Sequence, residues 1–200
     1  MSVIHVVLVD DHPFVRTGIR NILSKNSNIQ VVGEAADGYQ ALQLVDSLEP
    51  DVLVLDMEMP GMKGIDVARE LRAKGSNMPI LALSAHEDRQ FILGMLANGA
   101  AGYLVKDEVP ETIVRAIQGV ASGEQGWVSR RVAARIAVWL KAEKLNEMKL
   151  DERDIWMLQL FLAGRSDLEI SRSVGISKDE VNKRLESAVI AVRECLYRIF

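Results

Sequence analysis

Five polar side chains stand at the ends of short apolar runs in the first 106 residues of the sequence. They are Asp10, Asp11, Asp56, Ser84 and Lys106. Each one alone suits a helix cap or a solvated loop. The carboxyl ends of parallel strands, however, meet at one edge of a sheet. If the apolar runs are parallel strands, these five side chains converge, and their convergence makes them candidates for chemistry.

The three carboxylates, the hydroxyl and the amine together suit a particular kind of chemistry. Carboxylates held close together repel each other, which raises a pKa unless a cation neutralises them. Mg²⁺ prefers carboxylate and water oxygens and suits phosphate chemistry. A lysine and a hydroxyl opposite stabilise an oxyanion, and a carboxylate can itself attack phosphorus to form an acyl phosphate. The set therefore favours phosphoryl transfer at a magnesium site.

Strand-like and helix-like segments alternate along residues 1–121. The run from Val52 to Leu55 is too short for a typical helix and leads through Asp56 to the turn at Pro60-Gly61. This pattern is typical of a strand buried on both faces. Five such strand and helix units predict an α/β domain with a five-stranded, parallel, doubly wound sheet and helices on both faces.

Composition limits the class of protein. The 200 residues carry a formal net charge of −4 and 48% hydrophobic residues, which favours two small domains and gives no bulk attraction to nucleic acid. The single cysteine, Cys195, excludes an internal disulfide. The apolar run that opens the chain stops at Asp10, so we expect neither a signal peptide nor a membrane span, and a cytoplasmic location.

Several motifs in residues 1–121 resemble the receiver domain of two-component response regulators. They are Asp10-Asp11, the stretch from Asp56 through Met-Pro-Gly-Met-Lys-Gly, Ser84-Ala85, and Gly-Ala-Ala-Gly-Tyr-Leu-Val-Lys ending at Lys106. The resemblance implies a flavodoxin-like sheet with strand order 2-1-3-4-5. It also implies that Asp56 accepts a phosphoryl group from a sensor histidine kinase.

The resemblance assigns the remaining site residues as well. Asp11, Asp56 and the backbone carbonyl of Glu58 would hold Mg²⁺, with Asp10 helping through water. Ser84 and Lys106 would contact the phosphoryl oxygens, and Tyr103 matches an aromatic switch position. Phosphorylation would then change the surface that sets homodimerisation or interdomain docking. By composition alone, Tyr103 is equally well explained as an ordinary aromatic residue of a strand.

Residues 122–149 are predicted to be a linker. Ser122 to Gly126 is a turn-rich break. From Ser129 to about Asn146, apolar residues recur at helical spacing and predict an amphipathic helix. Its basic residues suit either a solvated face or contact with phosphate. They are Arg130, Arg131, Arg135, Lys141 and Lys144.

Residues 150–200 are predicted to form three short helices. Asp151 is a predicted N-cap, and Ser166 with Glu169 has the spacing of a capping box, which recurs at Ser177 and Glu180. A tight turn between the second and third helices is helix-turn-helix geometry. This region resembles the LuxR-type helix-turn-helix of NarL/FixJ-class response regulators, in which the third helix enters the DNA major groove.

The third helix departs from that pattern. Glu180, Asn182 and Arg184 stand where the family has threonine, a basic residue and histidine, and Arg193 replaces a glycine, so the fourth helix is predicted to be missing or merged. Residues 150–200 carry eight basic and nine acidic side chains, which disfavours phosphate binding. The candidate DNA contacts are Lys178, Asn182, Lys183 and Arg184.

Three functions remain open at this level. The first is a phosphorylation-controlled regulator that binds promoter DNA. The second keeps the receiver domain, while its helix-turn-helix has lost DNA binding and serves dimerisation or protein interaction. The third, an enzyme such as a phosphatase, lacks a second nucleophile and base pair, because His5, His12 and His86 form no ligand or triad pattern.

Overall fold

The computed structural model describes residues 3–139 and 148–199 of the chain. Backbone contacts divide it into two compact units, Met1–Trp127 and Val128–Phe200. Each unit is described by itself below. The finer boundaries at residues 121 and 149 stay a prediction of the sequence.

The first unit is built on a parallel sheet. Its strands are β1 (Ile4–Val9), β2 (Ile29–Ala35), β3 (Val52–Asp56), β4 (Ile80–Ser84) and β5 (Gly102–Val105), to which β6 (Trp127–Val128) is added. The strand order is β2-β1-β3-β4-β5-β6, and β1 to β5 pair in parallel. The predicted flavodoxin-like α/β class and the order 2-1-3-4-5 are therefore confirmed.

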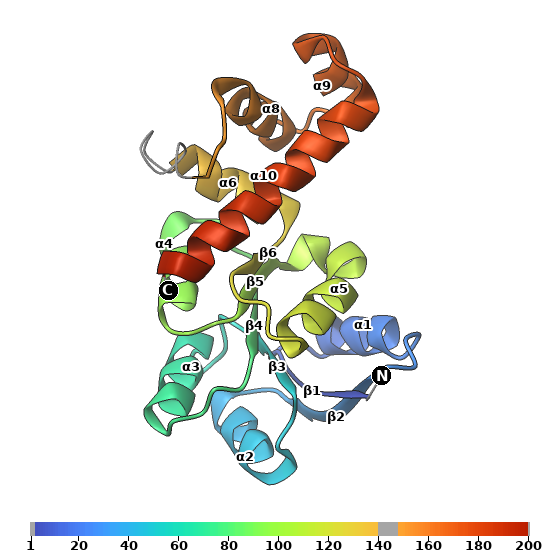
Figure 1. The fold of residues 1–200 in the computed structure, drawn as a ribbon. Helices are drawn as coiled ribbons and strands as arrows, with labels where there is room; N and C mark the ends of the chain where they lie inside the picture. Colours follow the sequence, from blue (N-terminus) through green and yellow to red (C-terminus); the bar gives the residue numbers. More distant parts are fainter. Residues whose placement is uncertain (1–2, 140–147, 200) are drawn as a thin grey trace. The chain divides into compact units, whose positions relative to one another are not determined.

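Helices cover both faces of this sheet (Figure 1). They are α1 (Pro13–Leu23), α2 (Gly38–Leu48), α3 (Gly64–Ala73), α4 (Arg89–Ala97) and α5 (Val109–Ala121), with a short 3₁₀ turn, η1 (Lys106–Glu108), before α5. Helices α1 and α5 lie on one face, and α2, α3 and α4 lie on the other. Every residue of β3 is buried because both of its faces are covered.

The sixth strand was not predicted. Trp127 donates its backbone N–H to the carbonyl of Ala101 at 2.9 Å, which extends the sheet beyond β5. Gly123 and Gly126 have φ values of 97° and 66°, so they take the left-handed conformations that turn the chain back toward the sheet. A strand of two residues is too short to show a period in the sequence, and the turn residues before it were the only visible signal.

The loop between β3 and α3 depends on a close backbone approach at Gly64. A Cβ built there would lie 2.2 Å from the carbonyl oxygen of Asp56. Gly64→Ala is therefore expected to lower the free energy of unfolding by about 1–3 kcal/mol, as overpacking does. Urea unfolding of the full chain measures it.

Gly18 provides the matched control for that substitution. It lies inside α1, and a Cβ there would meet nothing within 4 Å. Gly18→Ala is expected to stabilise the chain by roughly 0.5–1 kcal/mol, because alanine loses less backbone entropy in a helix. Equal effects of the two substitutions would contradict the close approach at Gly64.

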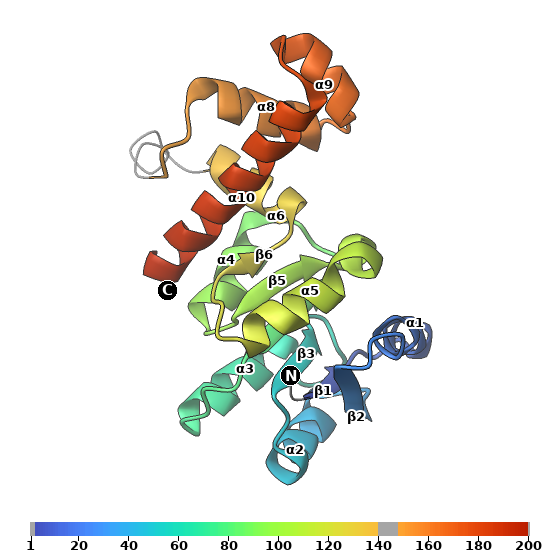
Figure 2. The same cartoon turned by 45° about the vertical axis from the view of Figure 1, so that its right-hand side comes forward.

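The second unit is helical in the part that is described (Figure 2). Its helices are α6 (Arg130–Trp139), α8 (Glu152–Leu162), α9 (Asp167–Val174) and α10 (Lys178–Ile199). The predicted linker helix corresponds to α6 as far as Trp139, and α6 packs against α8 and α10. Its predicted continuation through Leu140, Lys141 and Lys144 lies outside the described residues.

The three predicted helices of residues 150–200 are present as α8, α9 and α10. Gly175 ends α9 with a φ of 72°, and the buried residues of α10 include Val181, Leu185, Ala188 and Val192. Helix α10 runs without a break through Arg193 to Ile199. The predicted fourth helix is therefore merged with the third, because arginine continues a helix where a glycine would end it.

The predicted helix caps are present. Asp151 and Asp154 form a reciprocal capping box on α8, and Ser166 and Glu169 form another on α9. At the start of α10 the backbone N–H of Glu180 donates to Ser177 Oγ at 3.1 Å. These bonds satisfy orphan N–H groups of the first helical turns and set where each helix begins.

The capping box of α8 makes the second unit sensitive to acid. The hydrogen bond from the Asp154 backbone N–H holds the pKa of Asp151 below its ordinary value, and Arg184 adds to this. A carboxylate whose pKa is lower in the folded state than in the unfolded state stabilises the fold at pH values above its unfolded pKa. This contribution is lost as the pH falls through the folded pKa. We therefore expect the melting temperature to decrease when the pH is lowered below about 4.

Asp151→Asn isolates the charge, because asparagine is also a good N-cap. Thermal unfolding of the wild type and the variant between about pH 3 and about pH 7 measures the effect. The gap between their melting temperatures should close as the pH falls. A gap of constant size would show that the carboxylate charge of Asp151 is not involved.

Candidate functional site

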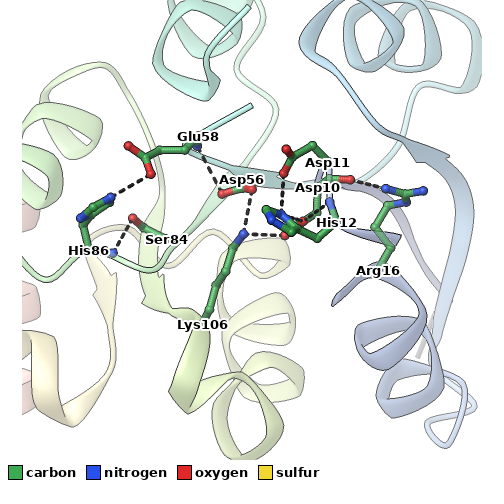
Figure 3. A network of polar contacts seen from close by, with 9 residues as sticks. All are labelled: Asp10, Asp11, His12, Arg16, Asp56, Glu58, Ser84, His86 and Lys106. Carbon is green, nitrogen blue, oxygen red and sulfur yellow. Dashed lines mark hydrogen bonds and ion pairs between the residues drawn. The ribbon is translucent and has the colours of Figure 1, made fainter. Parts of the chain in front are cut away.

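The carboxyl ends of β1, β3, β4 and β5 bring the predicted residues to one edge of the sheet (Figure 3). Asp10, Asp56 and Ser84 are almost fully buried there, at 0%, 2% and 1% exposure. Burial of polar groups is costly unless they are paired. The burial of these three polar side chains indicates a functional site at this edge. The parallel arrangement of their strands explains why they converge, as the sequence predicted.

Lys106 lies between the two buried acids. Its Nζ is 2.7 Å from Asp56 Oδ2 and 2.8 Å from Asp10 Oδ2. Burial raises the pKa of Asp56 above its ordinary value, although the hydrogen bond from Lys106 opposes the change. Burial alone would lower the pKa of Lys106, but the hydrogen bonds with Asp10 and Asp56 outweigh it and raise that pKa. The lysine is therefore a fixed positive charge at Asp56.

A ligand set for a metal ion lies beside this pair. Asp10, Asp11, His12 and Asp56 each offer one atom, and these atoms all lie within 4.8 Å of one another. Asp10 Oδ2 and Asp11 Oδ1 are buried, and they face Lys106 Nζ at 2.8 Å and His12 Nδ1 at 2.6 Å. Clustered carboxylate oxygens of this kind suit a hard divalent cation. The residues present therefore fit Mg²⁺.

His12 is part of the site although sequence reasoning gave it no role. Its Nδ1 is 2.6 Å from Asp11 Oδ1, and its backbone N–H donates to Asp10 Oδ1 at 2.8 Å. Arg16, one turn into α1, donates from Nη1 to the carbonyl of Asp10. The position of His12 directly after Asp11 was the signal available in the sequence.

A second group connects the loops after β3 and β4. His86 Nε2 lies 2.8 Å from Glu58 Oε2, and the His86 backbone N–H donates to Ser84 Oγ at 3.0 Å. The Glu58 backbone N–H in turn faces Asp56 Oδ1 at 3.3 Å. Ser84 and Glu58 are thus placed next to Asp56, and His86, which was also given no role, links them.

Tyr103 is fully buried on β5. Its hydroxyl donates to the backbone carbonyl of His86 at 2.9 Å. Burial raises the pKa of Tyr103 to about 12, so the phenol stays neutral and remains a donor. The Tyr103 side chain therefore contacts the loop that follows Ser84.

The four candidate DNA contacts on α10 differ in their surroundings. Lys178 and Lys183 are exposed. Arg184 Nη1 lies 2.7 Å from Asp154 Oδ1 and 3.4 Å from Asp151 Oδ2. The hydrogen bond with Asp154 raises the pKa of Arg184 above its ordinary value. Arg184 thus helps to hold α10 against the start of α8.

Asn182 is also engaged within the second unit. Its Oδ1 accepts a hydrogen bond from Nη2 of Arg130, the first residue of α6, at 3.1 Å. Two of the four candidates therefore already have partners in their own unit. Sequence reasoning missed these contacts because α6, α8 and α10 are far apart along the chain.

Comparison with known proteins agrees with this geometry. Residues 6–118 match the family described as the response regulator receiver domain. The nitrate/nitrite response regulator protein NarL of Escherichia coli K12 is 35% identical over 182 residues, which cover 88% of this chain and 83% of that protein. The chain is thus similar to NarL through both of its units.

Two solved structures extend the comparison. The signal receiver domain of a response regulator NarL from Mycobacterium tuberculosis is 41% identical, with a TM-score of 0.59, and the match covers 62% of this chain and 99% of that one. The response regulator RcsB in complex with DNA matches with a TM-score of 0.62 over 96% of this chain and 93% of that one. At 23% identity, the second likeness shows the fold alone.

No helix in residues 3–139 or 148–199 is long and apolar enough to cross a membrane.

Proposed function

Because this chain belongs to the response regulators, in the NarL/LuxR-type group, we propose that it is a phosphorylation-controlled transcription regulator that binds promoter DNA. Its relatives are response regulators and not metabolic enzymes. The proposed chemistry is therefore limited to phosphorylation of the chain itself and hydrolysis of that phosphoryl group. A sensor histidine kinase would be the donor, and the cytoplasm the site of action. The observation that carries the proposal is Asp56, which is buried and bonded to Lys106 at the sheet edge.

Asp56 is proposed as the phosphoacceptor. Its Oδ2 is held by Lys106 at 2.7 Å, and Oδ1 faces the backbone N–H of Glu58 at 3.3 Å. Lys106 neutralises charge that builds up on the phosphoryl oxygens, and the Ser84 hydroxyl, on the neighbouring strand, donates to one of them. The carboxylate attacks phosphorus, the bond from phosphorus to the donor breaks, and an acyl phosphate forms.

Mg²⁺ is the proposed cofactor of this step. Asp11, Asp56 and the Glu58 backbone carbonyl would hold it, and Asp10 would contribute through water. When bound, the ion neutralises negative charge on the phosphoryl group and the carboxylates. His12 faces this set through Asp11 and orders the first turn after β1.

Phosphorylation at Asp56 would change the surface of the first unit. The added charge and acceptor oxygens attract the Ser84 hydroxyl. Ser84 Oγ presently accepts the N–H of His86, whose carbonyl holds the Tyr103 hydroxyl. A movement of Ser84 would therefore be transmitted to Tyr103 through His86. We propose that this rearrangement promotes homodimerisation.

The second unit is the proposed DNA-binding output. It has the turn between α9 and α10 that a helix-turn-helix requires, and the match to the DNA-bound RcsB fold covers almost the whole chain. Lys178 and Lys183, which are exposed on the first turns of α10, suit phosphate contacts. The proposed reader of bases is Asn182.

The test is a fluorescence anisotropy titration of the full chain against promoter fragments, with and without acetyl phosphate and Mg²⁺. Phosphorylation should strengthen binding, and the affinity should fall steeply as salt rises, because released counterions drive the association. Lys178→Gln and Lys183→Gln should each reduce the salt slope by about 1. Absence of binding at low salt would overturn the DNA-binding output.

A second candidate output, protein interaction, is favoured by two observations. Arg184 is held by Asp154 and Asp151, and the acids Asp179 and Glu180 stand in the first turn of α10. Negative charge there opposes phosphate. Phosphorylation-dependent dimerisation in analytical ultracentrifugation, without any DNA binding, would favour this candidate over the first.

A further inference from the structure

His12 occupies the N-cap position of α1 without capping the helix. Serine, threonine, aspartate and asparagine are preferred there, because their side-chain oxygens accept a hydrogen bond from the first turn. The His12 backbone is extended, with a φ of −90° and a ψ of 109°, yet its side chain caps no N–H group in the described part of the chain. Helix capping therefore does not explain a histidine at this position.

The imidazole of His12 is instead turned toward the carboxylates that follow β1 (Figure 3). Its Nδ1 lies 2.6 Å from Asp11 Oδ1 and 3.4 Å from Asp10 Oδ1. Lys106 contacts the other carboxylate oxygen of Asp10, Oδ2, at 2.8 Å. The buried carboxylate of Asp10 thus presents one oxygen to the lysine and the other to His12.

These distances are close to those between ligand atoms around one small divalent ion. Donor atoms about 2.1 Å from a tetrahedral Zn²⁺ ion lie about 3.4 Å from one another. The Nδ1 atom of His12 already has this separation from Asp10 Oδ1, and Asp11 Oδ1 would have to move away from Nδ1 by less than about 1 Å. One atom each of Asp10, Asp11, His12 and Asp56 lies within 4.8 Å of the others. Small side-chain shifts therefore bring one nitrogen and several oxygens onto the same ion.

A nitrogen donor changes which ions such a site prefers. Mg²⁺ takes oxygen ligands and usually keeps several waters, so it gains little from an imidazole. Imidazole nitrogen suits Zn²⁺, Ni²⁺ and Fe²⁺, and zinc sites often combine histidine with carboxylates. The His12 nitrogen should therefore raise the affinity for these ions much more than the affinity for Mg²⁺.

We propose that His12 is a metal ligand, which lets the magnesium site also bind Zn²⁺ and similar transition-metal ions. The inference rests on the metal site of the proposed function. It adds a nitrogen donor to the oxygen set of Asp11, Asp56 and the Glu58 carbonyl. Because Zn²⁺ and Mg²⁺ share Asp11 and Asp56, the two ions exclude each other.

The test compares the dissociation constants of Zn²⁺ and Mg²⁺ for the full chain, measured at one pH by isothermal titration calorimetry, separately and in competition. His12→Asn removes the imidazole, and asparagine is a good N-cap, so the start of α1 is kept. The ratio of the Zn²⁺ affinity to the Mg²⁺ affinity should fall by at least about tenfold, because even the groups behind a metal ligand typically contribute roughly 10–100-fold to affinity. X-ray absorption at the zinc edge should show a bound imidazole in the wild type and none in His12→Asn.

His5 provides the matched control. It lies near the start of β1, where its Nδ1 is 3.6 Å from Asp51 Oδ2 and both side chains are half exposed. His5→Asn removes the same imidazole from a histidine–carboxylate pair outside the site. The ratio of the two affinities and the zinc spectrum of His5→Asn should equal those of the wild type.

A metal ligand and a residue that only positions Asp11 give different results. If His12 only positioned Asp11, His12→Asn would weaken the binding of both ions equally, because both use Asp11. An unchanged ratio, or a wild-type zinc spectrum without imidazole, overturns the inference while the magnesium site stands. If the wild type binds neither ion, the metal site of the proposed function falls and the inference falls with it. If it binds Zn²⁺ through an imidazole but does not bind Mg²⁺, the proposed cofactor falls and His12 remains a ligand.

Discussion

Replacement of Asp56 by asparagine is expected to abolish labelling of the chain by acetyl phosphate and Mg²⁺. Asparagine has nearly the same shape, but its amide offers no carboxylate to attack phosphorus. Intact-protein mass spectrometry should show a phosphorylated species for the wild type and none for Asp56→Asn. Treatment with hydroxylamine should release the wild-type label, because the proposed bond is an acyl phosphate.

Asp66 serves as the control for this prediction. It is a half-exposed carboxylate on α3 that pairs with Arg69, so Asp66→Asn removes the same charge away from the sheet edge. Labelling of Asp66→Asn should equal that of the wild type. If Asp56→Asn is labelled as well as the wild type, the assignment of the phosphoacceptor is wrong, whatever the function of the second unit.

Replacement of Lys106 by methionine is expected to lower the free energy of unfolding and to prevent labelling by acetyl phosphate. The substitution leaves Asp10 and Asp56, at 0% and 2% exposure, facing each other without the cation that now bonds to both. Breaking a buried ion pair from one side costs about 3–5 kcal/mol. Lys106 itself is 19% exposed, so we expect a loss of about 2–4 kcal/mol in the free energy of unfolding. Urea unfolding in the presence of a chelator measures it.

Added Mg²⁺ should restore part of that stability, because it would neutralise the same carboxylates. Lys74→Met is the control. Lys74 forms an ion pair with Asp46 in which both side chains are largely exposed, at 45% and 60%. Its loss should cost only about 0–1 kcal/mol. A Lys106→Met chain as stable as the Lys74→Met chain would contradict the view that Lys106 holds the buried acids together.

Much of the first unit could be predicted because its local patterns and its fold agree. The runs Val52 to Leu55 and Ile80 to Leu83 are continuous apolar segments, as buried parallel strands require, and both became strands of the sheet. The short strand β6 was missed, because two residues show no periodicity and its pairing depends on Ala101.

The candidate site was predictable in part for a related reason. Strand ends are local features, and parallel pairing brings them together, so Asp10, Asp56 and Lys106 could be expected at one edge. The contacts of His12 and His86 could not. Their partners, Asp11 and Glu58, come from turns whose side-chain directions depend on loop geometry and not on any repeat in the sequence.

By itself the sequence determined most of the helices and strands, the two-part organisation and the polar residues at the strand ends, because periodicity, caps and strand-end acids are local properties. Only the tertiary structure decided how α10 can be used. Asn182 and Arg184 read as free polar groups in the sequence, but packing against α6 and α8 gives them Arg130 and Asp154 as partners. Such contacts join residues distant in the chain, so they exist only once the helices have packed.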